Sequence, residues 1–177
     1  AVRDYKECAI LGLLAWHNKG AIQSWKHSVE PDMSYDHNTY ACKIIGSTVR
    51  CEVLLAQLCP SLKDDALKIA ENAMQFLINQ SQPADAPLAY FPPTYYLDYV
   101  ASRHADNIGK TMTFEPLIVA HALLELYNIT DKKEYLDRAM NITDTYTRLQ
   151  AEDGSFPIKI DYQTGEPVNE VKASLDP

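Results

Sequence analysis

The chain has few of the features that mark several large classes of protein. Its 16 Lys and Arg residues form no cluster, and 24 Asp and Glu residues give a net charge of −8. Binding of nucleic-acid phosphates needs a basic stripe, so the composition excludes a nucleic-acid partner. The longest apolar stretch, 116–124, is half as long as a membrane-spanning helix and contains His121. No signal peptide is recognisable, although a mature chain would also lack one. The sequence therefore predicts binding to neither nucleic acid nor membrane.

Cysteine is also scarce. Cys8, Cys42, Cys51 and Cys59 form no C-x-x-C pair and lack the spacing of metal ligands. Three of the four fall in one apolar helical pattern, which is typical of small buried side chains. The sequence thus predicts no disulfide framework, no metal site and no cofactor, and it leaves the redox compartment open.

The chain does contain a series of helical patterns joined by alternately long and short connections. Apolar spacing predicts helices over 3–17, 38–58, 61–79, 113–127 and 131–149. The connections 18–37 and 80–110 are long, whereas the turns at 59–60 and 128–130 are short. Ser61 with Asp64, and Asp131 with Glu134, have the spacing of capping boxes. The tail from 151 reads as loop with a short strand at 158–160. These patterns predict an all-α fold with a single domain over 1–177.

The apolar patterns also predict how the helices are layered. Helices 38–58 and 113–127 are apolar on nearly every side, so we expect them inside, with the other three outside. Each long connection then leads from an outer helix to an inner one, which places the long connections at one common end. The N-termini of the inner helices lie there, and their free N–H groups favour anionic or hydroxyl-rich ligands. Phe91-Pro92 recurs as Phe156-Pro157, 65 residues later, which supports a repeating unit.

The segment Tyr146-x3-Gln150-x3-Gly154-x-Phe156 resembles the repeat of the α/α toroid superfamily. There a helix-terminal aromatic residue, a glutamine and an Asp-Gly-Ser/Gly-aromatic turn close each helical hairpin, and Phe76-x3-Gln80 is a partial second copy. The resemblance implies an α/α toroid of helical hairpin repeats. At this period the chain would form about half of a six-hairpin barrel and thus part of a larger toroid.

The members of this superfamily differ in their functional motifs. They include terpene cyclases, prenyltransferases, six-hairpin glycosidases and polysaccharide lyases. Neither the Asp-x-Asp-Asp motif of the squalene cyclase type nor the zinc ligands of protein prenyltransferases can be placed in this sequence. The loops instead carry Tyr, Trp, Asp, His and Asn, and this mixture resembles the carbohydrate-active branch.

Three residues near the starts of the inner helices are candidates for catalysis. Asp36 could act as general acid/base and His37 could orient it or the substrate. Glu115 would supply the second carboxylate that glycoside hydrolysis usually requires. Structural roles stay open for both acids, because Asp36 can cap a helix and Glu115 can satisfy a helix dipole.

Other loop residues are candidates for substrate binding. Aromatic faces stack on the C–H surfaces of sugars, and an arginine offers a planar, bidentate donor to a uronate carboxylate. The alternatives are packing of the loop for the aromatic residues and solvation for the charged ones, and His121 is expected to be a hydrogen-bonded core histidine. The substrate-binding candidates are Trp25, Tyr35, Tyr90, Tyr95, Tyr96, Arg103 and His104.

The leading hypothesis is therefore a carbohydrate-active enzyme, a glycoside hydrolase or polysaccharide lyase acting on an oligosaccharide that could contain uronate. A non-catalytic helical-repeat module that binds glycan or protein is the alternative, and a terpene cyclase-like enzyme is third. The sequence leaves the oligomeric state, the linkage and the compartment open.

Overall fold

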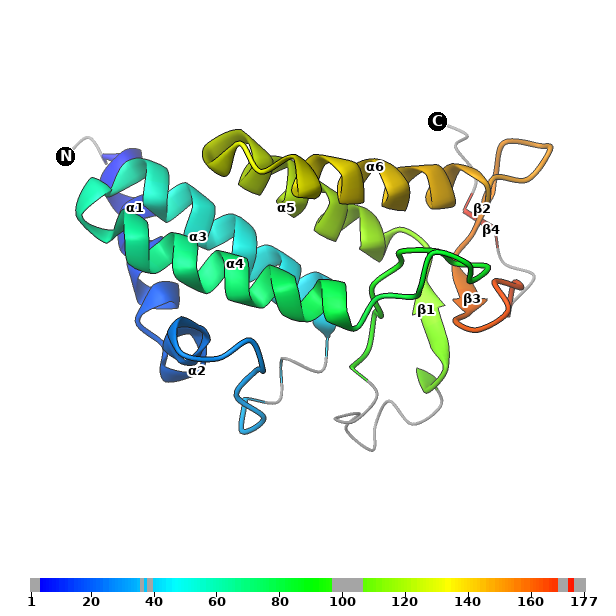
Figure 1. Ribbon diagram of the computed structural model, residues 1–177, viewed down its shortest axis with the longest axis horizontal. Helices are drawn as coiled ribbons and strands as arrows, with labels where there is room; N and C mark the ends of the chain where they lie inside the picture. Colours follow the sequence, from blue (N-terminus) through cyan, green and yellow to red (C-terminus); the bar gives the residue numbers. More distant parts are fainter. Residues whose placement is uncertain (1–3, 36, 38–39, 97–106, 169–171, 174–177) are drawn as a thin grey trace.

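The computed structural model describes residues 4–35, 37, 40–96, 107–168 and 172–173 of the chain, and most of them are helical (Figure 1). The predicted all-α class is confirmed at this level. Shorter turns of other helical types flank α2, α3 and α4. The α-helices are α1 (Tyr5–His17), α2 (Gly20–Gln23), α3 (Gly46–Leu58), α4 (Lys63–Asn79), α5 (Glu115–Thr130) and α6 (Lys133–Thr147). The flanking turns are the 3₁₀ turns η1 (Ser24–Lys26) and η4 (Pro60–Leu62) and the π-helical turn η3 (Ala41–Ile45).

All five predicted helices are present, but each begins at least two residues later than predicted, and neither predicted capping box forms. Helix α5 continues to Thr130, and Asp131 ends it in the left-handed conformation with φ 58°. Asp131 therefore does not cap α6, whose N-cap is Lys132. Ser61 lies inside the 3₁₀ turn η4, and no side chain caps the start of α4.

The four long helices from α3 to α6 form two pairs. In Figure 1, α3 and α5 run in the same direction, while α4 and α6 run back along them, α4 packed on α3 and α6 on α5. The close approach of α3 to α5 depends on Gly46, because a Cβ atom there would lie 3.3 Å from Cγ2 of Val119. Helix α5 starts at 115, 69 residues after α3 at 46, and α6 starts at 133, 70 residues after α4 at 63. The same helix order therefore occurs twice with nearly the same spacing.

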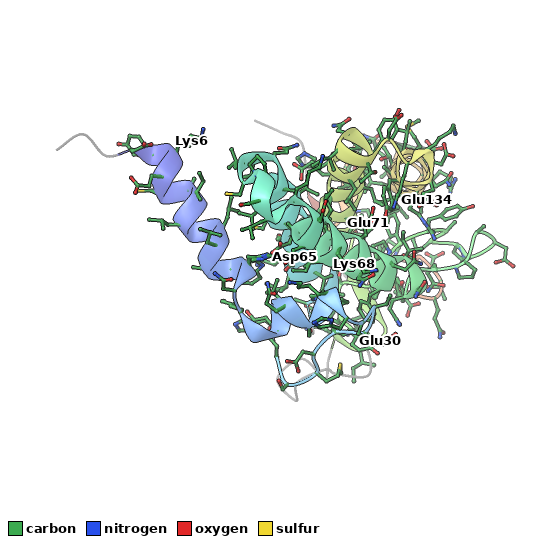
Figure 2. The ribbon with its side chains drawn as sticks, turned by 60° about the vertical axis from the view of Figure 1, so that its left-hand side comes forward. Lys6, Glu30, Asp65, Lys68, Glu71 and Glu134 are labelled. Atoms are coloured by element: carbon green, nitrogen blue, oxygen red, sulfur yellow. The ribbon has the colours of Figure 1, made fainter. Side chains whose placement is uncertain are left out.

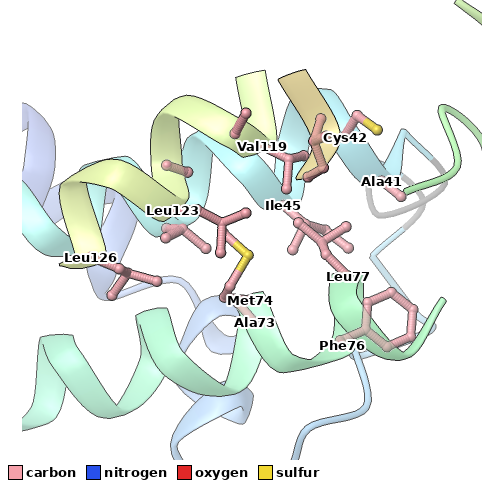
Figure 3. Close-up of a cluster of buried hydrophobic side chains, with 14 of the residues drawn as sticks. Ala41, Cys42, Ile45, Ala73, Met74, Phe76, Leu77, Val119, Leu123 and Leu126 are labelled. Atoms are coloured by element: carbon pink, nitrogen blue, oxygen red, sulfur yellow. The ribbon is translucent and has the colours of Figure 1, made fainter. Parts of the chain in front are cut away.

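The core fills the space between α3, α4 and α5 (Figure 3). Ile45, Leu77 and Leu123 are among its fully buried members. Each such side chain contributes about 1.5–3 kcal/mol relative to an exposed position, so this cluster is the main source of stability for the four-helix arrangement.

One face of the inner helices is open, contrary to the prediction that they are surrounded. Leu54 on α3 is 43% exposed and Leu124 on α5 is 39% exposed. The expectation of a core histidine at His121 is also wrong, because its side chain is 56% exposed and its Nε2 lies 3.4 Å from Glu125 Oε1. Helices α4 and α6 cover α3 and α5 from one side only, which leaves this stripe uncovered.

Helix α1 is attached to the others mainly at its C-terminal end. Figure 2 shows it standing apart from the other long helices, and Tyr5 and Leu11 are 79% and 58% exposed. Near its end, Trp16 Nε1 donates to Thr48 Oγ1 at 3.3 Å and His17 meets Glu52 on α3. Two polar contacts thus fix α1 to α3.

The cysteines differ in burial, and all four are free thiols. Cys42 is buried, and its thiol donates to the carbonyls of Pro92 and Pro93. Cys51 is half-buried, as is Cys59, whereas Cys8 is exposed. The prediction of small buried side chains holds fully for Cys42 only.

There are two short antiparallel sheets, of which one ties the tail to the segment before α5 and the other lies within the tail. Strand β1 (Lys110–Met112) pairs with β3 (Lys159–Asp161), and β2 (Phe156–Pro157) pairs with β4 (Lys172–Ala173). The sequence predicted β3 one residue early and missed β1. Among the residues that the structure describes, no helix is both long and apolar enough to cross a membrane.

The segment that carries the family resemblance forms a closed turn after α6. Gln150 Nε2 donates to the Gly154 carbonyl at 2.9 Å, and Gly154 has φ 82°, a conformation that glycine adopts readily. The rings of Tyr146 and Phe156 stack with centroids 4.5 Å apart and planes at 13°. The glutamine and the two aromatic residues thus hold the chain where it leaves the helix.

Candidate active site

The long connections meet at the end of the molecule where α3 and α5 begin. Segments 80–96, 107–114 and 150–168 lie at this end in Figure 1. The first long connection passes along α4, against which η1 packs, and then reaches the same end. The Tyr40 and Tyr95 rings from the two connections are 6.0 Å apart. The predicted common end is therefore present.

Glu115, the first residue of α5, is a half-buried acidic residue at this end. Its Oε2 is fully covered yet makes no hydrogen bond to any residue placed in the structure. Burial raises the pKa of the Glu115 carboxyl, while a hydrogen bond from Thr94 and the positive charge of Lys43 lower it, with a net rise. Incomplete satisfaction of a covered carboxyl favours its protonated form.

A chain of buried hydroxyls holds Thr94 in place. Thr94 Oγ1 accepts from the Met112 N–H at 2.9 Å and lies 2.8 Å from Thr111 Oγ1. A threonine hydroxyl has one proton, so when Thr94 gives it to Glu115 the Thr111 hydroxyl must donate to Thr94. Thr113 Oγ1 is buried nearby without a hydrogen-bond partner among the residues placed. Strand β1 and the loop before it thus form a polar lining beside Glu115.

A hollow of about 300 Å³ is lined by His37, Tyr40, Lys43 and Ile44, and the charge of Lys43 acts on the Glu115 carboxyl. Tyr40 faces Tyr95, and the pKa of Tyr95 is raised mainly by burial and then by the charge of Glu115. Lys43 and the Tyr40–Tyr95 pair therefore couple the hollow electrostatically to Glu115, which does not itself line it. Lys43 lies in the π-helical turn η3, and such turns occur frequently at functional sites.

This arrangement has the components for acid catalysis on a hydroxyl-rich molecule. A carboxyl with a raised pKa can hold a proton at a pH where an exposed carboxyl has lost it. Two phenol rings and a histidine provide faces and hydrogen bonds, and the exposed Lys43 adds a positive charge.

Of the other predicted site residues, Tyr35 and His37 lie next to this hollow. Their rings meet at 5.0 Å, and Tyr35 also contacts Trp16 at 6.5 Å. Tyr96 does not line the hollow. Its half-buried ring packs edge-to-face on Phe76, with ring centroids 5.0 Å apart.

Trp25 and Tyr90 do not share the hollow. Trp25 is fully buried against Phe76, with ring centroids 5.8 Å apart, so its assignment as the wall of a sugar subsite does not fit its place in the core. The Arg138 guanidinium of α6 lies 5.0 Å from the Tyr90 ring centroid. Tyr90 is thus directed to the outer helix rather than to Glu115.

Asp36, Arg103 and His104 lie outside the residues that the structure describes. Their proposed roles, as acid/base and as partners of a uronate carboxylate, stay predictions.

A second hollow, of about 460 Å³, lies on the open face of α3 and includes Arg50, Leu54 and Glu125. The Glu125 carboxyl in this second hollow differs from that of Glu115, because Arg50 donates to both Glu125 oxygens, at 3.1 and 3.3 Å. Both oxygens of this carboxyl thus have a hydrogen-bond partner, unlike those of Glu115.

Sequence reasoning missed Tyr40, Lys43 and Thr94. The first two lie in the apolar pattern of the second helix, where nothing separates them from ordinary helix residues, and Thr94 follows Pro92-Pro93 in a long loop. Among the residues that are placed, no group of three or more His, Cys, Asp and Glu could hold a metal ion.

A scan against protein-family models and searches of curated proteins and of solved structures found no match to this chain.

Proposed function

We propose that the chain is part of an α/α toroid that cleaves an oligosaccharide, with Glu115 as the general acid. One observation carries this proposal: a half-buried carboxyl, with one oxygen lacking a partner in the placed part of the chain, interacts electrostatically with Lys43, which lines a hollow together with His37 and Tyr40.

Three features of the fold support the toroid. The inner helices α3 and α5 run parallel, and each carries an antiparallel outer helix. The two pairs repeat after 69 and 70 residues, from 46 to 115 and from 63 to 133. The turn at Gln150–Phe156 is closed by the residues that carry the family resemblance.

In the proposed reaction the protonated Glu115 delivers its proton to the glycosidic oxygen as the bond to the sugar breaks. The departing sugar leaves as an alcohol, and Glu115 becomes a carboxylate that Lys43 and Thr94 stabilise. In a hydrolase, water adds to the other sugar with help from a second carboxylate, for which Asp36 stays the candidate. In a lyase, a base removes a ring proton and leaves a double bond.

Side chains around the hollow would bind the sugar next to Glu115. Tyr40 and Tyr95 present aromatic rings from two connections, and sugar C–H faces pack on such rings. Lys43, which lines the hollow, would bind a uronate carboxylate. This would give Lys43 part of the role that the sequence assigned to Arg103 and His104.

The test compares Glu115→Gln with Glu125→Gln, which changes a second glutamate of the same helix. Wild type and variants are incubated with neutral and uronate-containing oligosaccharides, and new reducing ends and unsaturated products are measured. Loss of a general acid lowers turnover by about 10²–10⁴-fold, so we expect this loss for Glu115→Gln and near-normal turnover for Glu125→Gln. Full turnover by Glu115→Gln contradicts the proposal. Saccharide binding by the wild type without any product supports the non-catalytic alternative.

A further inference from the structure

An aromatic run extends from the hollow toward the end of α1. Tyr95 and Tyr40 are 6.0 Å apart, and Tyr40 lines the hollow together with His37. His37 meets Tyr35 at 5.0 Å, and Tyr35 meets Trp16 at 6.5 Å. In this aromatic run (Trp16, Tyr35, His37, Tyr40, Tyr95), three of the four neighbouring pairs are in ring contact, and His37 and Tyr40 share the lining of the hollow. A linear ligand along the run would contact several of these rings.

The aromatic run is fixed to the rigid part of the fold. At one end, Trp16 Nε1 donates to Thr48 of α3. In the middle, the Tyr40 N–H donates to the His37 carbonyl at 3.0 Å, and the Ile44 N–H donates to the Tyr40 carbonyl at 2.8 Å. These backbone bonds connect the run to η3 and hence to α3. A ligand would meet a surface that is largely formed before it binds.

The aromatic run differs from the aromatic core. Trp25 and Phe76 are fully buried, whereas the rings of Trp16 and Tyr35 are partly exposed and the His37 side chain is exposed. Cations lie along the run: Lys43 lines the hollow, and Lys19 Nζ lies 4.2 Å from the Trp16 ring centroid. Rings interleaved with hydrogen-bond donors suit a hydroxyl-rich chain better than an apolar one.

We infer that the aromatic run is a second binding segment for sugar units beyond the one at Glu115, so that the site takes a linear oligosaccharide longer than a disaccharide. This inference rests on the proposed function for the identity of the ligand. The sugar rings would lie along Tyr40, His37 and Tyr35, and the Lys19 ammonium would donate to hydroxyls near Trp16.

The test measures affinity as a function of saccharide length. Xylo-oligosaccharides and oligogalacturonides, each from disaccharide to hexasaccharide, are titrated by calorimetry into the wild type at low temperature and into Glu115→Gln. We expect the hexasaccharide of at least one series to bind more tightly than its disaccharide. Tyr35→Ala should weaken hexasaccharide binding about 3- to 10-fold, as expected for the loss of one aromatic contact, and leave disaccharide binding unchanged. Lys19→Ala, which removes the ammonium beside Trp16, should also weaken hexasaccharide binding only.

The matched control is Tyr5→Ala, which removes an exposed tyrosine from the far end of α1 and should change neither affinity. Lys19 is exposed, so Lys19→Ala tests the inference even if Tyr35→Ala fails to fold. If longer saccharides bind no more tightly, or if these variants weaken both saccharides equally, the inference is overturned, while Glu115→Gln still decides the proposed function. If Lys19→Ala removes the gain in affinity with length, and Glu115→Gln keeps full turnover, the aromatic run is supported and the catalytic role of Glu115 is rejected.

Discussion

Two glutamates on the neighbouring inner helices α3 and α5 are covered by the protein in different environments. Glu52 on α3 is 1% exposed, and its Oε2 accepts a hydrogen bond from His17 Nδ1 at 2.7 Å. Glu115 on α5 is half-buried, and its covered Oε2 has no partner in the placed part of the chain. Burial raises the pKa of both carboxyls; in Glu52 the bond and charge of His17 oppose the rise, and in Glu115 Thr94 and Lys43 do so.

The difference separates a structural acid from the proposed catalytic one. Burial of a carboxylate is costly unless a partner compensates for it, and Glu52 has a partner that is itself buried. The His17–Glu52 pair joins α1 to α3. Glu115 is compensated only in part, and its compensating charge, Lys43, lines a hollow; raised pKa values of this kind are frequent among catalytic acids. Burial alone therefore does not distinguish the two acids, whereas the partners of their oxygens do.

The largest expected effect is a loss of stability when the buried His17–Glu52 pair is broken. His17→Ala leaves Glu52 buried without its partner, and removal of one member of a buried pair costs about 3–5 kcal/mol. Urea unfolding followed by circular dichroism measures the loss. His27→Ala, at an exposed histidine, should leave the free energy of unfolding nearly unchanged.

A double variant sharpens that result. Replacing both members, His17→Leu with Glu52→Leu, removes the uncompensated charge and should restore most of the stability that His17→Ala loses. If His17→Ala costs less than about 1 kcal/mol, the pair is not the attachment that its geometry indicates.

The next effect concerns the contact that keeps the two inner helices together. A side chain at Gly46 would meet Val119 and Ile118, so Gly46→Leu should destabilise the fold by about 1–3 kcal/mol through overpacking. Gly12→Leu is the control, because nothing lies within 4 Å of a Cβ at that exposed helical position. There we expect a gain of about 0.5–1 kcal/mol from helix propensity. Thermal unfolding distinguishes the two, and equal effects would contradict the close approach of α3 and α5.

Helix positions were predictable because they depend on local periodicity. Helices α4 and α6 each have a single apolar stripe that can be recognised from short-range spacing in the sequence. This stripe is buried in the structure, with Ile69, Met74 and Ile142 among its members. Glu115 and Tyr95 could be placed near the starts of inner helices from helix order alone. The end of α5 was predicted three residues early, because Asp131 resembles a cap in sequence and acts as a terminator in the structure.

The partners within the site were not predictable, because they come together from distant parts of the chain. Thr94 reaches Glu115 through pairing with β1, which the sequence did not reveal. Trp25 appeared to be a loop residue, yet the 3₁₀ turn η1 packs on α4 and buries it. Loop composition alone cannot distinguish an aromatic residue that fills a core from one that lines a hollow.

The smallest expected effect tests the cost of burying Glu115. Its pKa in the folded protein is above the ordinary value of 4.5, so the folded state keeps the proton at a pH where the unfolded chain has released it. The carboxyl therefore contributes its full stability below about pH 4.5 and loses that contribution as the pH rises through the folded pKa. Glu115→Gln does not titrate, so its Tm should exceed that of the wild type by about 1–2 °C at pH 8, and the difference should vanish near pH 4. Glu125→Gln removes a carboxylate that Arg50 already holds and should gain nothing as the pH rises. A Glu115→Gln variant that is less stable than the wild type at pH 8 would mean that this carboxyl, like Glu52, is a structural acid.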